Sequence, residues 1–349
     1  MNYKYIFPGL TRISDLQTKE FEVDKRPLSE WSTGDYVICK IIVKGSDFFK
    51  IELANGRMRG VMGGESIVGA LGERHATLEA TGTWKNVEPD GKMHVLTGAG
   101  LVGKLTSKSV YVPEMMEVLY LGHVVRNGKK VTMNDFIVPY PDRDFKTPVI
   151  LFVGTSMSAG KTTSARIVTD IFKKAGISVV GAKLTGAGRF KDILAIKDVG
   201  ADAVFDFVDV GLPSSIYPRE AFKKRLKMLL NRISSVDADV AVIEIGASPL
   251  EPYNGDLAIE AIRDHIKCTI LSASDPYAVY GLMKAFDLIP DIVTGISTNT
   301  IAGSELVERL CGVRALNIIE PDTTDALIEV LQKSLGKELK ENELPKAYN

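Results

Sequence analysis

Residues 149–163 read Val-Ile-Leu-Phe-Val-Gly-Thr-Ser-Met-Ser-Ala-Gly-Lys-Thr-Thr, and no other segment of the 349-residue chain constrains the fold as much. Five apolar residues predict a buried strand, the glycine-bearing stretch predicts a loop, and the Gly-Lys-Thr-Thr end predicts a helix start. A strand, a small-residue loop and a helix N-terminus in this order form a cradle for phosphate, because the backbone wraps the anion and helix N–H groups point at it. The segment therefore predicts a nucleotide-binding P-loop in an α/β domain.

Within this loop, Lys161 is expected to reach the β- and γ-phosphates of a nucleotide, and the Thr162 hydroxyl is expected to bind Mg²⁺. ATP with Mg²⁺ is the predicted cofactor pair, and GTP stays open. A chance Gly-Lys-Thr at a helix start is the alternative, but the preceding strand and following helix favour the phosphate site. The residues expected to surround the phosphates are Gly154, Thr155, Ser158, Ala159, Gly160, Lys161, Thr162 and Thr163.

From residue 149 onward, short apolar runs alternate with helical stretches, a pattern typical of a buried parallel sheet with crossover helices. We predict an open, mainly parallel, doubly wound sheet in a P-loop domain over 149–336, with a charged tail at 337–349. The expected strands are 149–153, 178–182, 240–245, 268–272, 292–296 and 313–318, and the expected helices are 161–175, 218–233, 276–286 and 324–335.

The first part of the chain has a different pattern. Residues 1–140 contain short β-like segments, at 36–43, 48–53, 76–84 and 93–96, separated by turn signals such as Asn55-Gly56. They predict a smaller β-rich N-terminal domain that serves a substrate or a partner. The proline-containing residues 141–148 are expected to form the linker, and two domains suit a chain of this length.

Composition narrows the class of protein. With 43 basic and 44 acidic side chains the net charge is -1, which provides no general attraction for polyanions, so nucleic acid is not expected as a partner. Cys39, Cys268 and Cys311 show neither disulfide nor zinc spacing. No signal peptide and no apolar run of membrane-spanning length are recognised, so we expect a cytoplasmic protein without a membrane partner.

The loop resembles the form Gly-Thr-Asp-x-x-x-Gly-Lys-Thr of dethiobiotin synthetase and of the amidotransferase-linked synthetases of cobalamin synthesis, P-loop proteins of the SIMIBI class. Lys183 follows in 178–186, where that family has a lysine facing the substrate and the transferred phosphoryl group. Glu244 lies in 238–249, which is similar to the family's strand ending in Glu-Gly-Ala-Gly. At the carboxyl end of a central strand a carboxylate suits Mg²⁺. The resemblance implies a catalytic set of Lys161, Lys183 and Glu244.

Further residues complete the hypothesis. A second Mg²⁺ carboxylate is expected after the second strand, where Asp192 and Asp202 are both candidates. Asn299 resembles a turn asparagine that contacts the nucleobase in this group, although asparagine is also a common turn former. Thr185 and Arg189 are candidate substrate contacts. A guanidinium suits a carboxylate or transition-state charge, and a surface role for Arg189 is the alternative.

Two positions depart from the family. Ser156 replaces the loop aspartate, and Met157 replaces a small polar residue, so a substrate other than that of dethiobiotin synthetase is expected. Ser156 also stands where dimeric partitioning and arsenite-pump ATPases carry a signature lysine, which disfavours a nucleotide-sandwich dimer. The chain also resembles a P-loop family linked to N-acetylation of D-glutamate, at 202–211 and 244–252.

These features predict an ATP- and Mg²⁺-dependent ligase, synthetase or kinase-like enzyme that activates a small carboxylate-bearing metabolite by phosphoryl transfer. A homo-oligomer, with a dimer as the first expectation, would be the assembly. The alternatives are a nucleotide-dependent switch or delivery protein acting on a protein partner, and an amino-acid N-acyltransferase in which the P-loop holds coenzyme A phosphates.

Overall fold

The computed structural model describes residues 4–42 and 49–339. The chain forms two compact units. Unit 1 contains the residues up to Pro139 together with Gly186–Lys191 and Asp206–Leu229, and unit 2 contains Tyr140–Thr185, Asp192–Phe205 and the residues from Leu230 onward. The chain therefore leaves the α/β region twice to join unit 1, which the sequence did not indicate. Residues 141–148, predicted as the linker, have no regular secondary structure. Most of the predicted tail, 340–349, lies outside the described residues.

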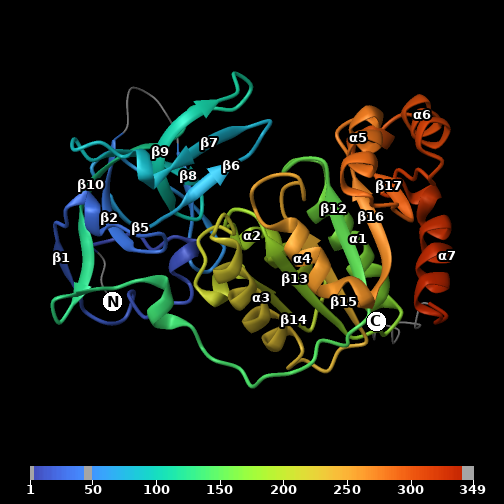
Figure 1. The fold of residues 1–349 in the computed structure, drawn as a ribbon, viewed down its shortest axis with the longest axis horizontal. Helices are drawn as coiled ribbons and strands as arrows, with labels where there is room; N and C mark the ends of the chain where they lie inside the picture. Colours follow the sequence, from blue (N-terminus) through green and yellow to red (C-terminus); the bar gives the residue numbers. More distant parts are fainter. Residues whose placement is uncertain (1–3, 43–48, 340–349) are drawn as a thin grey trace, which may run out of the picture. The chain divides into compact units, whose positions relative to one another are not determined.

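A six-stranded sheet forms the centre of the α/β region (Figure 1). Its order is β14-β13-β15-β12-β16-β17, and the pairings from β13 through β17 are parallel. The strands are β12 (Val149–Gly154), β13 (Val179–Thr185), β14 (Ala203–Asp206), β15 (Val240–Ile245), β16 (Ile266–Ser272) and β17 (Ile292–Thr294). This is the predicted P-loop type of α/β fold, preceded by a β-rich domain.

The order of the strands determines where a ligand can bind. β12 comes first in the chain yet lies inside the sheet, between β15 and β16, so the chain builds outward from it in both directions. Open α/β sheets bind ligands beyond the carboxyl ends of the strands where this direction reverses. The P-loop follows β12 directly and therefore lies at that point.

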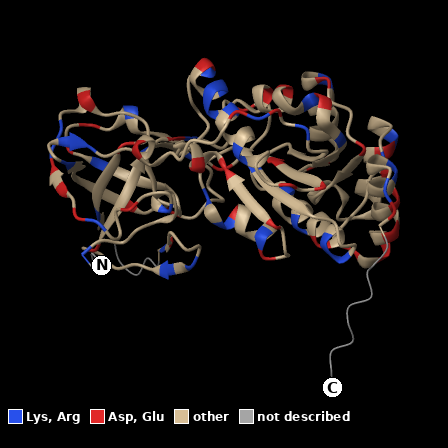
Figure 2. Cartoon of the chain, turned by 90° about the horizontal axis from the view of Figure 1, so that it is seen from below, with Lys and Arg blue, Asp and Glu red and all other residues tan. Residues whose placement is uncertain are grey.

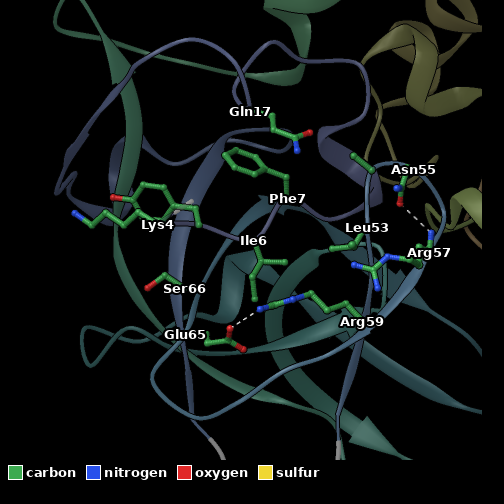
Figure 3. A pocket seen from close by; sticks show the side chains of 12 residues that line it. Lys4, Ile6, Phe7, Gln17, Leu53, Asn55, Arg57, Arg59, Glu65 and Ser66 are labelled. Carbon is green, nitrogen blue, oxygen red and sulfur yellow. Dashed lines mark hydrogen bonds and ion pairs between the residues drawn. The ribbon is translucent and has the colours of Figure 1, made fainter. Parts of the chain in front are cut away.

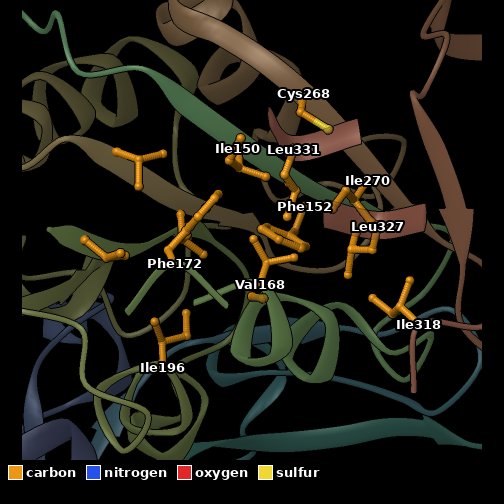
Figure 4. Packing of buried hydrophobic residues seen from close by; sticks show 14 of the residues in the cluster. Ile150, Phe152, Val168, Phe172, Ile196, Cys268, Ile270, Ile318, Leu327 and Leu331 are labelled. Carbon is orange, nitrogen blue, oxygen red and sulfur yellow. The ribbon is translucent and has the colours of Figure 1, made fainter. Parts of the chain in front are cut away.

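The helices are α1 (Lys161–Lys174), α2 (Phe190–Lys197), α3 (Arg219–Ile233), α4 (Gly255–Ile262), α5 (Pro276–Phe286), α6 (Ile301–Cys311) and α7 (Thr324–Leu335). The predicted helices correspond to α1, α3, α5 and α7, whereas α2, α4 and α6 were not predicted. In unit 2, Phe152 and Ile270 of the sheet pack with Val168 and Phe172 of α1 and with Leu331 of α7 (Figure 4). This packing fixes the start of α1 relative to the end of β12.

The predicted strand at 313–318 is wrong. α6 ends at Cys311 and is capped by Gly312, which adopts a left-handed φ of 67°. Within the following segment, Ala315 forms one isolated bridge to Val293 of β17. The chain then turns, with Glu320 N–H donating to the Asn317 carbonyl, so no ladder can extend. β14, which the acidic composition of its surroundings concealed, occupies the opposite edge of the sheet.

Unit 1 is built on a nine-stranded sheet in which β10, β2, β5, β9 and β8 pair in a closed ring, because β8 pairs with both β9 and β10. All the pairings are antiparallel except that of β5 with β9. The strands are β1 (Glu22–Asp24), β2 (Tyr36–Ile42), β5 (Ser66–Leu71), β6 (Glu73–His75), β7 (Ala80–Thr83), β8 (Lys92–Thr97), β9 (Leu101–Lys108), β10 (Glu117–Arg126) and β11 (Lys129–Lys130). A separate hairpin joins β3 (Lys50–Glu52) and β4 (Met58–Gly60).

Basic and acidic residues are interspersed over both units (Figure 2), in keeping with the balanced charge. None of the helices in the described part of the chain has the length and apolar character needed to cross a membrane.

Candidate functional site

Two glycines shape the loop between β12 and α1. Gly160 precedes the helix with a φ of 112°, a conformation that side chains rarely adopt. At Gly154 an added Cβ would lie 2.8 Å from Nζ and 2.9 Å from Cγ of Lys161, so the lysine chain lies directly against this glycine. The loop has the backbone of a phosphate cradle, and a side chain at Gly154 would displace Lys161.

Lys161 is 2% exposed, and its Nζ donates a hydrogen bond of 2.6 Å to the Ser156 carbonyl. Burial lowers the pKa of Lys161 from 10.5 to about 8; the Glu244 carboxylate opposes this shift, and Lys183 adds to it by repulsion. An anion bound in the loop would offset the desolvation of this ammonium group. The site therefore favours a ligand that brings negative charge.

The register of the parallel strands brings the other predicted catalytic residues together. Glu244 of β15 lies opposite Lys183 of β13 on one side and opposite Phe152 of β12 on the other. Its carboxylate accepts a 2.8 Å hydrogen bond from the Thr162 hydroxyl, and its Oε1 lies 3.6 Å from the Lys183 Nζ. Thr162, Lys183 and Glu244 thus meet at the carboxyl edge of the sheet.

The donor set suits a magnesium ion. The Thr162 hydroxyl and the Glu244 carboxylate are hard oxygen ligands, which Mg²⁺ prefers. Within residues 4–42 and 49–339 no group of three or more His, Cys, Asp or Glu residues could hold a metal ion by itself. Mg²⁺ characteristically takes one or two protein oxygens and completes its shell with phosphates and water, so this sparse set fits a nucleotide-bound ion.

The structure separates the two candidate carboxylates. Asp192, in the first turn of α2, lies 2.5 Å from the Lys183 Nζ. Asp202 instead pairs with Lys173 at 2.8 Å and accepts a 2.6 Å bond from the Val179 N–H, at the amino start of β13. Val179 and Lys183 are four residues apart in β13, which is about 13 Å along a strand, so Asp202 lies at the amino end of β13 and away from Lys183. Asp202 is therefore not placed to bind the same ion as Thr162, which corrects its inclusion in the metal site.

Thr185 ends β13 two residues after Lys183, whereas Arg189 belongs to the other compact unit. The Thr185 hydroxyl is buried and donates 3.1 Å to the Gly246 carbonyl, so it ties β13 to the segment after β15. Arg189 belongs to unit 1, where it lines a cavity with Arg74. The substrate contacts of Thr185 and Arg189 stay predictions.

The predicted base-contacting turn lies against the P-loop. Gly295 has a φ of 87°, and an added Cβ would lie 2.3 Å from the Ala159 carbonyl oxygen. Asn299, four residues further on, is exposed and follows the short helix 296–298 as its C-cap.

In the phosphate loop itself, Ser158 and Thr163 are exposed, and the Thr155 hydroxyl accepts a 3.0 Å bond from the Ser274 N–H.

Sequence reasoning missed some residues that shape this site. Gly295 is not among the predicted site residues, although a glycine directly after a buried strand is a signal for close backbone approach. Ala247 was also missed. It is buried three residues after Glu244 with a φ of 63°, a strained conformation for a residue with a side chain. No local signal in the sequence indicates this strain.

Comparisons with known proteins place this geometry in context. No known protein family matches the sequence, and no curated protein matches it. Among solved structures, chloroplast FtsY from Physcomitrella patens is similar with 15% identity and a TM-score of 0.34, over 52% of this chain and 62% of that one. Hydrogenase maturation factor HypB from Archaeoglobus fulgidus is similar with 13% identity and a TM-score of 0.37, over 54% of this chain and 90% of that one. A ParA family ATPase from Chlorobium tepidum TLS is similar with 15% identity and a TM-score of 0.30, over 54% of this chain and 91% of that one.

The chain thus spans less than two thirds of the FtsY structure. The similarity to these proteins is distant and covers about half of the chain. The class of protein is indicated by the site itself: the geometry of the loop with Lys161, Thr162 and Glu244 is that of a P-loop nucleotide site. The resemblances to dethiobiotin synthetase and to the D-glutamate acetylation family stay predictions.

Proposed function

We propose that this protein is an ATP- and Mg²⁺-dependent enzyme that transfers a phosphoryl group to a small carboxylate-bearing metabolite. The observation that carries the proposal is a second buried lysine beside the P-loop. Lys183 is 6% exposed and lies between Asp192 and Glu244. It is at the carboxyl edge of the sheet, where Lys161 already lies against the P-loop. Holding a nucleotide in a P-loop requires one such lysine, so a second one suits an additional anionic group.

The residues divide the work as follows. Lys161 would hold the phosphates against the loop, and Thr162 with Glu244 would hold Mg²⁺, which neutralises phosphate charge when bound. Lys183 would attract the substrate carboxylate and stabilise the charge that develops on the transferred phosphoryl group. Asp192 keeps Lys183 in position through its ion pair.

The product expected from such a transfer is an acyl phosphate, formed when a carboxylate oxygen bonds to the γ-phosphorus as the bond to ADP breaks. A nucleophile such as an amine would then react with it. Hydroxylamine reacts with acyl phosphates in the same way, so it can trap this product as a hydroxamate.

The test measures ADP release with Mg²⁺-ATP and a panel of small carboxylic acids, with hydroxylamine present. We expect carboxylate-dependent turnover and hydroxamate in the wild type, and loss of both in Lys183→Ala with ATP affinity retained. The matched control is Lys267→Ala, which removes an exposed lysine near the amino end of β16, at the other edge of the same sheet. Tight ATP binding without turnover on any carboxylate would contradict the proposal.

A nucleotide-dependent switch is the second candidate. One observation favours it: the chain leaves unit 2 directly after Thr185, enters unit 1 for Gly186–Lys191, and returns at Asp192, the partner of Lys183. A ligand that replaces Asp192 as the partner of Lys183 would release Asp192, which directly follows the Gly186–Lys191 segment. A switch predicts slow hydrolysis without metabolites and stimulation by a protein partner.

Ligand-induced stabilisation distinguishes the remaining alternatives, because a ligand that binds the native state raises the melting temperature. We expect ATP to raise the melting temperature. A rise with GTP instead would indicate that GTP is the nucleotide, and a rise with acetyl-CoA would indicate the acyltransferase. The dimer stays a prediction, which light scattering can measure.

A further inference from the structure

A cavity in unit 1 lies far along the sequence from the phosphate loop. It has a volume of about 580 Å³, which falls in the range of small-molecule sites. One wall is the segment Tyr5–Phe7, which pairs with β5 through a bridge between Ile6 and Ile67. The other wall is the β3–β4 hairpin, held to this segment by the Ala54 N–H bonded to the Phe7 carbonyl. All the lining residues belong to unit 1.

Positive charge gathers in this cavity. Arg57 and Arg59 are two residues apart at β4, so their side chains emerge on the same face, and both project from the hairpin into the cavity (Figure 3). Lys4 lines the cavity as well, and Glu65 is the single acidic residue among the lining residues. Three cations and one carboxylate leave two positive charges without a counter-charge in the wall.

The hydrogen bonds show which of these groups are available. Arg59 donates from Nη2 to Glu65 at 2.6 Å, whereas its buried Nη1 has no hydrogen-bond partner in the described part of the chain. Glu65 is further engaged by the Met62 N–H at 2.7 Å. The guanidinium of Arg57 makes no hydrogen bond or ion pair with residues 4–42 or 49–339. Only the backbone of Arg57 is engaged: its N–H donates to the Asn55 Oδ1, and its carbonyl accepts from the Leu53 N–H.

Glu65 stays ionised, and this holds Arg59 in place. Burial acts to raise the pKa of Glu65, but the hydrogen bonds from Arg59 and from the Met62 N–H outweigh burial, so its pKa lies below the ordinary value. Arg59 is therefore fixed by one edge of its guanidinium, and the other edge remains for a ligand. A preorganised guanidinium beside a second, unengaged one suits an anion with several oxygens.

We propose that this cavity, formed by Arg57, Arg59 and Lys4, binds a small organic dianion. Its two uncompensated positive charges match a dicarboxylate or a phosphate monoester, and the apolar side chains of Ile6 and Leu53 provide a surface for a short carbon skeleton. The site is independent of the proposed function, because none of its residues belongs to the P-loop, Lys183 or Glu244 set.

The test is isothermal titration of the full chain with two probes, glutarate and glycerol 3-phosphate, and with their neutral counterparts, glutaramide and glycerol. The glycerol 3-phosphate titration also uses a Lys161→Met background, so that phosphate in the P-loop does not contribute. We expect at least one dianion to bind, neither neutral compound to bind, and binding to weaken as salt screens the charges. The probe that binds identifies the source of the dianion.

Arg57→Gln is the diagnostic variant, because the Arg57 guanidinium makes no hydrogen bond or ion pair in the described part of the chain. It should bind the dianion about tenfold more weakly, as expected for loss of a charge-assisted hydrogen bond. Lys25→Gln removes one exposed charge of unit 1 outside the cavity and should bind like the wild type. Melting in the absence of probe checks that each variant folds, and Lys4→Gln replaces Arg57→Gln if the latter does not.

Two results would overturn the proposal. One is a wild type that binds neither glutarate nor glycerol 3-phosphate at low salt. The other is an Arg57→Gln or Lys4→Gln variant that folds and binds the dianion as tightly as Lys25→Gln does.

Discussion

Lys161 should take up a proton when the nucleotide binds. With a pKa of about 8 in the ligand-free site, this lysine is half protonated at pH 8 and about nine-tenths protonated at pH 7. Phosphates placed against its ammonium group would raise the pKa and complete the protonation. Binding of Mg²⁺-ATP should therefore take up about half a proton at pH 8 and about a tenth of a proton at pH 7.

Calorimetric titration in buffers of different ionisation enthalpy measures this uptake directly. Lys161→Met should abolish the uptake and weaken nucleotide binding by about 10- to 100-fold, the range expected when hydrogen bonds from a charged group are lost. Lys333→Met, which removes an exposed lysine of α7, should change neither quantity. Equal proton uptake at the two pH values, or unchanged uptake in Lys161→Met, would refute the account of the site.

The same lysine also affects stability, with a sign that can be checked. The folded pKa of Lys161 lies below the ordinary 10.5, so the unfolded chain holds more protons between about pH 8 and 10.5, and this group makes stability rise with pH across that window. Below pH 8 its charged form costs the fold about 3 kcal/mol. Lys161→Met should therefore melt above the wild type at pH 7 without nucleotide, and the difference should shrink as the pH approaches 10.5.

Three further changes separate the parts of the site. Glu244→Gln should raise the Mg²⁺ concentration required for nucleotide turnover by about 10- to 100-fold, as measured by magnesium titration, and an unchanged requirement would remove this residue from the metal site. Gly295→Ala should weaken nucleotide binding, because the added Cβ would lie 2.3 Å from the P-loop carbonyl oxygen of Ala159. The control is Gly281→Ala, at an open position on α5, which should leave nucleotide binding unchanged and stabilise the helix by about 1 kcal/mol in thermal melts. Asp202→Asn should leave the magnesium requirement unchanged and cost about 1 kcal/mol or less in chemical denaturation, since its ion pair with a lysine is partly exposed; a shifted magnesium requirement would restore it as a ligand.

Several parts of the protein followed from the sequence alone, because their signals are local. A strand, a loop with Gly154 and Gly160, and a helix beginning at Lys161 are encoded by contiguous residues, and the structure contains them in that order. Uninterrupted apolar runs likewise indicated a sheet buried on both faces. The residues of β12 and β15 are indeed buried throughout.

The tertiary structure decided what depends on register and on strand direction. Asp192 and Asp202 are ten residues apart and equally polar, yet only Asp192 pairs with Lys183. Asp192 lies in the first turn of α2, soon after the carboxyl end of β13, whereas α2 leads the chain back so that Asp202 lies beside the start of that strand. The closure of the unit 1 ring through β8 is also invisible in the sequence, since it depends on which strands pair rather than on which residues form them. Local sequence determined the phosphate loop, whereas long-range pairing determined which charged groups surround it.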